Sequence, residues 1–168
     1  MKRILALSLA LLLVFGLAAC GGEEKPKENA KPVEMAVADI YTRLTEVIAM
    51  PEMLVVGDGM IVDFCGIEES DRKSAVVAIC ADSLKTDEIW VIEAVDEAAA
   101  ERIVALAKSR LKKKGEESIT YSPEQYAVVE KAQLLQNGNH VILLVSPDVD
   151  AMATALATIT GTTFEKMN

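Results

Sequence analysis

The chain has 168 residues, of which 51% are hydrophobic, and it carries 17 basic against 26 acidic side chains for a formal net charge of -9. This length suits a single compact domain, and this apolar content excludes a wholly disordered chain. The acidic balance argues against nucleic-acid binding, because the phosphates require a basic face. With 1 histidine and 3 cysteines, the chain has few side chains for a metal site or a catalytic triad.

Residues 1–19 have the pattern of a secretory signal peptide. Lys2 and Arg3 form a positive start, and an apolar run follows from Ile4 to Phe15. A membrane-spanning helix needs roughly 20 apolar residues, so this run fits the apolar core of a signal peptide better. The tetrad Leu17-Ala18-Ala19-Cys20 then resembles a bacterial lipobox, where a signal peptidase cuts just before a cysteine that receives lipid.

By that resemblance, Cys20 carries a diacylglyceryl thioether and is the first residue of the mature protein. Two or three acyl chains hold a protein lastingly at a membrane, because each buried methylene contributes about 0.8 kcal/mol and one chain binds only marginally. We therefore expect a lipid-anchored protein on the extracytoplasmic face of the cell membrane. The alternative is an ordinary signal peptide that is cut elsewhere, with Cys20 incidental.

Residues 20–33 are expected to be the lipidated cysteine followed by a flexible tether. The segment after Cys20 (GGEEKPKENAKPV) is rich in glycine, proline and charge, with too little apolar surface to order itself. A random coil of this length spans roughly 20 Å. A single folded domain is then expected over residues 34–168, just above the membrane.

In the first half of this domain, spacing and composition predict one helix and three strands. Apolar residues from Val37 to Ile48 recur at helical spacing, and Pro51 follows them. Short apolar runs rich in β-branched residues predict strands. These runs are 60–65 and 74–81, expected as an antiparallel pair, and 89–95.

A long helix is predicted after the third strand. Asp96 is expected to cap its start, and Gly115 is expected to end it, just after Lys114. Ser122-Pro123-Glu124-Gln125 predicts the start of a second helix, with serine as the cap and proline in the first turn. The glutamine is expected to complete a capping box with the serine.

The remaining sequence predicts a hairpin and a last helix. Asn137-Gly138 tolerates the positive φ of a type I′ turn and separates the predicted strands 132–136 and 140–145. Ser146-Pro147-Asp148 repeats the cap-and-proline start, and the apolar residues from Val149 to Ile159 share one helical face.

The expected element order is α-β-β-β-α-α-β-β-α. Adjacent strands joined by short turns favour an α+β domain with a largely antiparallel five-stranded sheet packed with helices. The strand over 141–145 is apolar on both faces, so helices are expected to cover much of both sides of the sheet.

Cys65 and Cys80 lie on neighbouring predicted strands of a protein that is expected to leave the reducing cytoplasm. A disulfide can persist outside the cytoplasm. The spacing of the two cysteines matches no metal or redox signature, and the chain has no CxxC pair. The alternative is that both are buried as small apolar side chains.

Five basic residues gather toward the predicted end of the long helix, and they are Lys108, Arg110, Lys112, Lys113 and Lys114. Cations there complement the partial negative charge of a helix C-terminus, each contributing about 0.3–1 kcal/mol. The alternative is contact with anionic lipid headgroups or wall polymers, which an anchored protein meets constantly.

No catalytic constellation stands out in the sequence, so neither an enzyme activity nor a metal or cofactor is expected. His140 follows the hairpin turn and is expected at the rim of a strand. Zinc needs three or four closely spaced ligands, and no such cluster occurs. Paired loop carboxylates such as Asp63 and Asp82 would suit acid–base chemistry, whereas the alternative is that they are solvated loop acids.

The second half of the chain carries a more specific pattern. Its features are Arg110-Leu111, then Tyr121-x-Pro123-Glu124-Gln125-Tyr126, and then Asn137-Gly138-Asn139 with the strand VILLVS and a helix. In these features the stretch from about Asp82 to Leu156 resembles a family of small bacterial lipoproteins, common in Firmicutes and known only as domain of unknown function 4358. The resemblance implies no activity, cofactor or catalytic residue.

Together these features favour a membrane-anchored extracytoplasmic lipoprotein that acts as a non-enzymatic binding or scaffold module, with a protein partner in the cell envelope. Two other hypotheses stay open. One is an accessory lipoprotein that binds a small ligand in a cleft between sheet and helices. The other is a carboxylate-based hydrolase of wall components.

Overall fold

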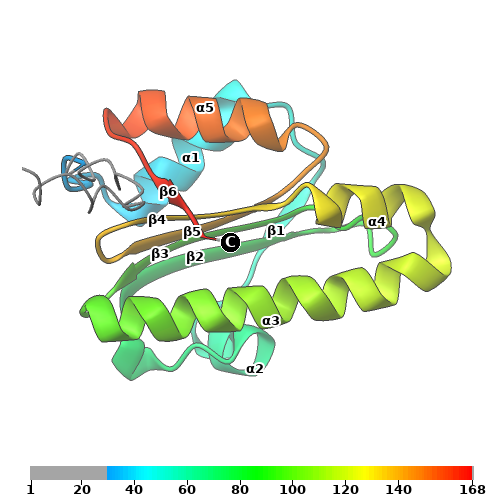
Figure 1. The fold of residues 1–168 in the computed structure, drawn as a ribbon, viewed down its shortest axis with the longest axis horizontal. Helices are drawn as coiled ribbons and strands as arrows, with labels where there is room; N and C mark the ends of the chain where they lie inside the picture. The colour runs from blue at the N-terminus through cyan, green and yellow to red at the C-terminus, as the bar shows by residue number, and fades with distance from the viewer. Residues whose placement is uncertain (1–29, 168) are drawn as a thin grey trace, which may run out of the picture.

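The computed structural model describes residues 30–167, which form an α+β domain with six strands and five α-helices (Figure 1). The strands make one sheet in the order β1-β2-β3-β5-β4-β6, and all neighbours run antiparallel. The predicted class is confirmed, with six strands in place of five. The strands are β1 (Met53–Val55), β2 (Arg72–Cys80), β3 (Glu88–Ala94), β4 (Gln133–Asn137), β5 (His140–Val145) and β6 (Glu165–Lys166).

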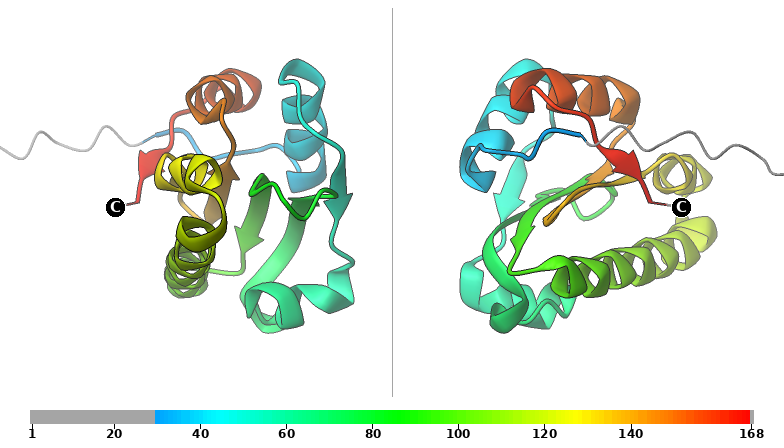
Figure 2. Two further views of the ribbon diagram at one scale, coloured as in Figure 1. Left: turned by 90° about the vertical axis from the view of Figure 1, so that its right-hand side faces the viewer. Right: turned by 60° about the vertical axis from the view of Figure 1, so that its left-hand side comes forward.

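Helices cover both faces of the sheet, as predicted (Figure 2). One face carries α1 (Val37–Val47) and α5 (Val149–Thr160). The other carries α3 (Glu97–Tyr121), with α4 (Pro123–Glu130) and the short α2 (Ile61–Cys65) beside it. Side chains alternate between the two faces of a strand, so β3 contributes to both apolar cores.

The prediction of a strand over 60–65 is wrong. This segment forms a 3-10 turn (Asp58–Met60) followed by α2, which ends at Gly66 in the left-handed conformation (φ 74°). Ile61 and Cys65 are buried in the same core while Asp63 between them is exposed, whereas a strand would point all three side chains to one face. The neighbour of β2 is instead β1, a strand that was not predicted.

The predicted end of the long helix is also wrong, although Asp96 caps its start as expected and accepts a hydrogen bond from the Ala99 amide at 2.8 Å. α3 continues through Gly115 to Tyr121. Gly115 lies against α4, where a Cβ would make an ordinary contact with the ring of Tyr126 at 3.6 Å. The last turn of α3 carries no basic residue, and the helix-terminus explanation for the basic cluster therefore fails.

The predicted hairpin is confirmed, with its loop displaced by one residue. Asn137 pairs with His140 across the end of β4 and β5, so the loop is Gly138-Asn139, and Gly138 has a φ of 53°. The start of α4 at Pro123 is also confirmed.

The chain enters the domain slightly earlier than the predicted residue 34. The backbone carbonyl of Lys31 accepts hydrogen bonds from Asn137 Nδ2 (3.0 Å) and Thr162 Oγ1 (2.6 Å). Entry is therefore at the hairpin end of the sheet (Figure 1). The predicted signal peptide, Cys20 and most of the predicted tether lie outside the described residues. Over residues 30–167, no helix has both the length and the apolar character needed to cross a bilayer.

Candidate functional site

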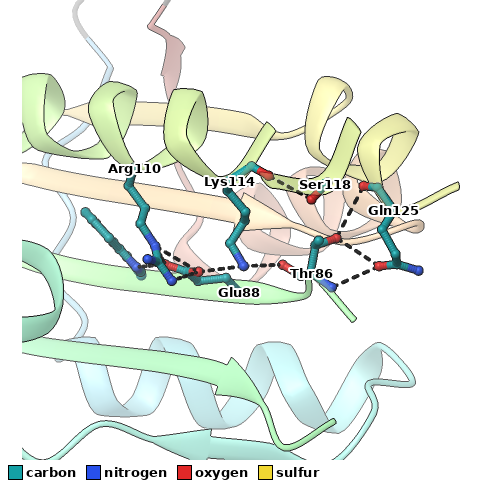
Figure 3. A network of polar contacts seen from close by, with 7 residues as sticks. Thr86, Glu88, Arg110, Lys114, Ser118 and Gln125 are labelled. Atoms are coloured by element: carbon teal, nitrogen blue, oxygen red, sulfur yellow. Dashed lines mark hydrogen bonds and ion pairs between the residues drawn. The ribbon is translucent and has the colours of Figure 1, made fainter. Parts of the chain in front are cut away.

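A fully buried carboxylate, that of Glu88, lies at the first residue of β3. It faces α3, because Trp90 two residues later packs in the core on that side. Trp90 Nε1 donates to Glu88 Oε1 at 2.8 Å. Arg110 donates from Nε to Oε1 and from Nη2 to Oε2, both at 3.0 Å, and Lys114 Nζ lies 2.9 Å from Oε2. Figure 3 shows these side chains converging on the carboxylate.

The two cations reach Glu88 from the buried stripe of α3. Ile103 and Ala107 are fully buried on this helix, and Arg110 and Lys114 continue the same stripe at spacings of three and four residues. Their side chains are 22% and 13% exposed, so both charges are largely withdrawn from water. The Arg110 guanidinium also lies 4.5 Å from the ring centroid of Phe64 on α2, in a cation–π contact.

The same network holds the loop before β3. Lys114 Nζ donates to the carbonyl of Thr86 at 2.9 Å. The Thr86 amide and hydroxyl then donate to Gln125 Oε1 at 2.9 and 3.0 Å (Figure 3). Gln125 therefore joins α4 to the loop 81–87, and its predicted capping-box role is wrong. Only the serine part of that prediction is confirmed, since Ser122 Oγ accepts from the Gln125 amide at 3.3 Å.

The electrostatics of the network favour an ionised Glu88. Burial alone would raise the pKa of Glu88, but the hydrogen bonds from Arg110 and the charge of Lys114 bring it below the ordinary 4.5. A buried carboxylate needs such partners, because its charge is costly away from water. Glu88 is thus an anion that fixes α3 to the end of the sheet, while Gln125 fixes α4 to the neighbouring Thr86.

Cys65 and Cys80 are buried free thiols in the structure, so it does not contain the predicted disulfide. Cys65 packs in the core beside α3. Cys80 is four residues after Val76 on β2, so the two side chains point to the same face of the sheet. Val76 packs with α1 and α5, on the face opposite to α3 and Cys65. A bridge would therefore have to cross the sheet. Burial, together with the charge of Glu88, raises the pKa of Cys65 to about 12 and suppresses the reactive thiolate.

We expect both core cysteines to be alkylated when the unreduced protein is denatured. The reason is that the sheet separates the two thiols, so nothing protects them once burial is lost. Iodoacetamide in concentrated urea without reductant, followed by peptide mass mapping, measures this labelling. Two cysteines that acquire label only after reduction would show that the bridge exists.

The five basic residues of the predicted anionic contact fall into two groups. Arg110 and Lys114 turn inward to Glu88. Lys108, Lys112 and Lys113 are exposed on the outer side of α3, and Lys112 lies 3.9 Å from Glu116. At most three of the five basic residues are therefore available to contact an anionic surface outside the domain.

The other sequence-predicted residues have local roles. Asp82 Oδ1 accepts from the Leu84 amide at 2.9 Å within its own turn, and Asp63 is exposed on α2. His140 is the first residue of β5, at the rim beside the hairpin turn as expected, and its burial lowers the pKa of the imidazole. Within residues 30–167, no three His, Cys, Asp or Glu side chains group in a way that could hold a metal ion.

Exposed apolar side chains lie at the end of the domain where Glu88 lies. Leu84 is 80% exposed, Tyr121 is 87% exposed and Ile119 is 57% exposed. Ile119 also lines a groove of about 360 Å³ between α3 and α4, with Leu111 and Tyr126. A second surface groove, of about 670 Å³, lies where α1 leads into β1. The small-ligand hypothesis thus has open surface grooves as candidates.

Comparison with known proteins identifies a family. Residues 47–146 match the model of a family described as "Domain of unknown function (DUF4358)". No curated protein and no solved structure matches the chain. The matched segment contains the whole Glu88 network, from Thr86 to Gln125.

Proposed function

The chain belongs to the DUF4358 family, and from this premise we propose that it is a lipid-anchored extracytoplasmic lipoprotein whose domain is a non-enzymatic binding module for a protein partner in the cell envelope. The lipid anchor is supported by the signal pattern and the tetrad ending at Cys20. Two or three acyl chains would give lasting attachment, with the domain outside the cytoplasm.

The observation that supports the binding role is the position of the chain entry relative to the exposed apolar residues. Lys31 is held at the hairpin end of the sheet by Asn137. β3 and β5 extend from that end, where Glu93 pairs with His140, to the other end, where Glu88 pairs with Val145. Tyr121 and Leu84 lie at this second end, so in an anchored domain they face away from the tether.

The Glu88 network gives this far end a fixed shape. Thr86, held by Lys114 and Gln125, fixes the base of the loop that carries Leu84. α4 is fixed by the same glutamine, directly after Tyr121. Exposed apolar and aromatic side chains on a rigid support are typical of protein interfaces, where tyrosine is enriched. We call the exposed side chains of Leu84, Ile119 and Tyr121, which share this end of the domain but not one side of α3, the far-end patch.

Site-specific cross-linking in cells tests the binding role. A photoactivatable amino acid at Leu84 or Tyr121 is expected to give an adduct of defined mass with one envelope protein, because the far-end patch contacts the partner. The matched control is Val95, which is 37% exposed at the opposite end of β3. Adducts would be identified by mass spectrometry. Equal adducts from all three positions, or none from the patch, would contradict the proposal.

A further inference from the structure

Residues 57–66 form a flap between two anchored points of the fold. Before the flap, the Val56 amide donates to the backbone of β2 at 2.8 Å, and after it Ile67 is fully buried. Gly59 stands near one end with no atom within 4 Å of the place a Cβ would occupy. Gly66 stands at the other end with a φ of 74°. Backbone freedom is thus concentrated at the two ends of the flap.

The Met60 and Gly66 amides of the flap make local hydrogen bonds. The Met60 amide donates to the carbonyl of Gly57 at 2.8 Å, and the Gly66 amide donates to the carbonyl of Val62 at 2.7 Å. Side chains make the attachment to the domain instead. Ile61 and Cys65 enter the core beside α3, and the Phe64 ring lies over Arg110.

Within residues 30–167, one ion pair adds to these apolar contacts. Asp58 of the flap pairs with Arg72 at the start of β2, and its backbone carbonyl accepts from Arg72 Nη2 at 3.0 Å. The Arg72 side chain is only 5% exposed, whereas that of Asp58 is 73% exposed. Arg72 Nε is buried and has no hydrogen-bond partner among the described residues 30–167. The buried cation therefore depends on a carboxylate for which water and salt compete.

We propose that residues 57–66 are a hinged flap that opens as a local unit while the rest of the domain stays folded. The Asp58–Arg72 pair is its latch. Opening lifts Phe64 from the guanidinium of Arg110 and brings the Cys65 thiol into water. Segments with few buried contacts and local hydrogen bonding open at a lower free energy than the whole domain. This inference concerns the motion of the fold and does not depend on the proposed function.

The two core cysteines make the opening measurable. Cys65 is part of the flap with its thiol in the core, and Cys80 lies on the far side of the sheet, so flap opening exposes the first thiol and global unfolding exposes both. Alkylation of the full chain under native conditions, with labelled peptides mapped by mass, reports each rate separately. Asp58→Ala is expected to raise the Cys65 rate about fivefold, the factor that corresponds to 1 kcal/mol, and to leave the Cys80 rate unchanged.

Asp63→Ala is the matched control, because Asp63 is an exposed carboxylate of the same flap and is not part of the latch. Gly59→Ala is expected to slow Cys65 labelling by about twofold, since alanine fits the open space and reduces the freedom of the hinge. If Asp58→Ala does not fold, the salt dependence of the wild-type labelling rates tests the proposal instead. Raising salt from about 0.1 to about 1 M screens the latch, so the Cys65 rate should rise while the Cys80 rate stays the same. Rates for Cys65 and Cys80 that rise together, or a Cys65 rate that responds to neither Asp58→Ala nor salt, would overturn the proposal.

Discussion

Replacing Glu88 with glutamine is expected to lower the free energy of unfolding by about 3–5 kcal/mol, because it leaves the charges of Arg110 and Lys114 buried without their anion. Glutamine keeps the size of the side chain and one acceptor oxygen, so the loss reports mainly on charge. Urea denaturation followed by circular dichroism measures the change. The slope of the transition is expected to stay constant, since the unfolded chain exposes the same surface.

An exposed ion pair provides the control for this substitution. Lys73 Nζ lies 3.1 Å from Glu93 Oε1, and the two side chains are 52% and 30% exposed. Lys73→Gln should therefore cost less than about 1 kcal/mol. An apolar triple variant with Glu88→Leu, Arg110→Met and Lys114→Met is expected to recover much of the loss. A Glu88→Gln variant no less stable than Lys73→Gln would show that the network contributes little.

Acid should reduce the difference between wild type and the Glu88→Gln variant. The folded pKa of Glu88 lies below the ordinary 4.5, so its contribution is complete above the ordinary value and is lost as pH falls through the folded one. Unfolding free energies measured at about pH 7 and about pH 3 test this sign. A stability difference that is unchanged or larger at the lower pH would contradict it.

Changing Cys20 to alanine is expected to move the protein from the membrane fraction to the soluble fraction, or to leave it as an unprocessed precursor. The variant has no thiol to accept the diacylglyceryl group, and about 0.8 kcal/mol per buried methylene is lost with the acyl chains. Fractionation of cells and mass measurement of the mature chain check the result.

Cys80→Ala is the control for the anchor, because this cysteine lies in the core and its removal should leave membrane attachment intact. Membrane retention of a Cys20→Ala variant that has lost residues 1–19 would contradict lipid anchoring. Release of both variants would show that fractionation reflects folding rather than lipid.

Much of the fold was predictable, because it depends on local signals. The serine cap of α4, the Asp96 cap of α3 and the Asn-Gly turn each satisfy backbone groups within a few residues. The wrong predictions concern segments whose local structure depends on tertiary contacts. Residues 60–65 are β-branched and apolar enough for a strand, but the core beside α3 accepts Ile61 and Cys65 from one helical side. Gly115 is typical of a helix end in sequence, but it lies buried within α3, which packs against α4 at this point.

The network around Glu88 was missed for a different reason. Its members come from β3, α3 and α4, and the expected third strand began one residue after Glu88. A signal was nevertheless present, since Arg110 and Lys114 continue the buried stripe of α3 past Ala107. Two cations on an apolar helical face require an anion, and a glutamate two residues from a buried tryptophan was available. Position in the sequence alone does not separate these two inward-facing cations from the three exposed lysines beside them.

The hydrogen bonds at Lys31 have a mechanical consequence for an anchored protein. Among residues 30–167, tension from a membrane anchor would act first on this carbonyl, where Asn137 and Thr162 hold it. If these bonds yield, residues 31–36 can straighten before α1 begins, to a fully extended length of at most about 20 Å at roughly 3.4 Å per residue. Val33 and Met35 then leave the surface of the core, while the sheet and α3 keep their contacts. Under tension on the anchor, the entry segment (residues 31–36) would extend and lengthen the tether. The far-end patch would keep its structure during this extension.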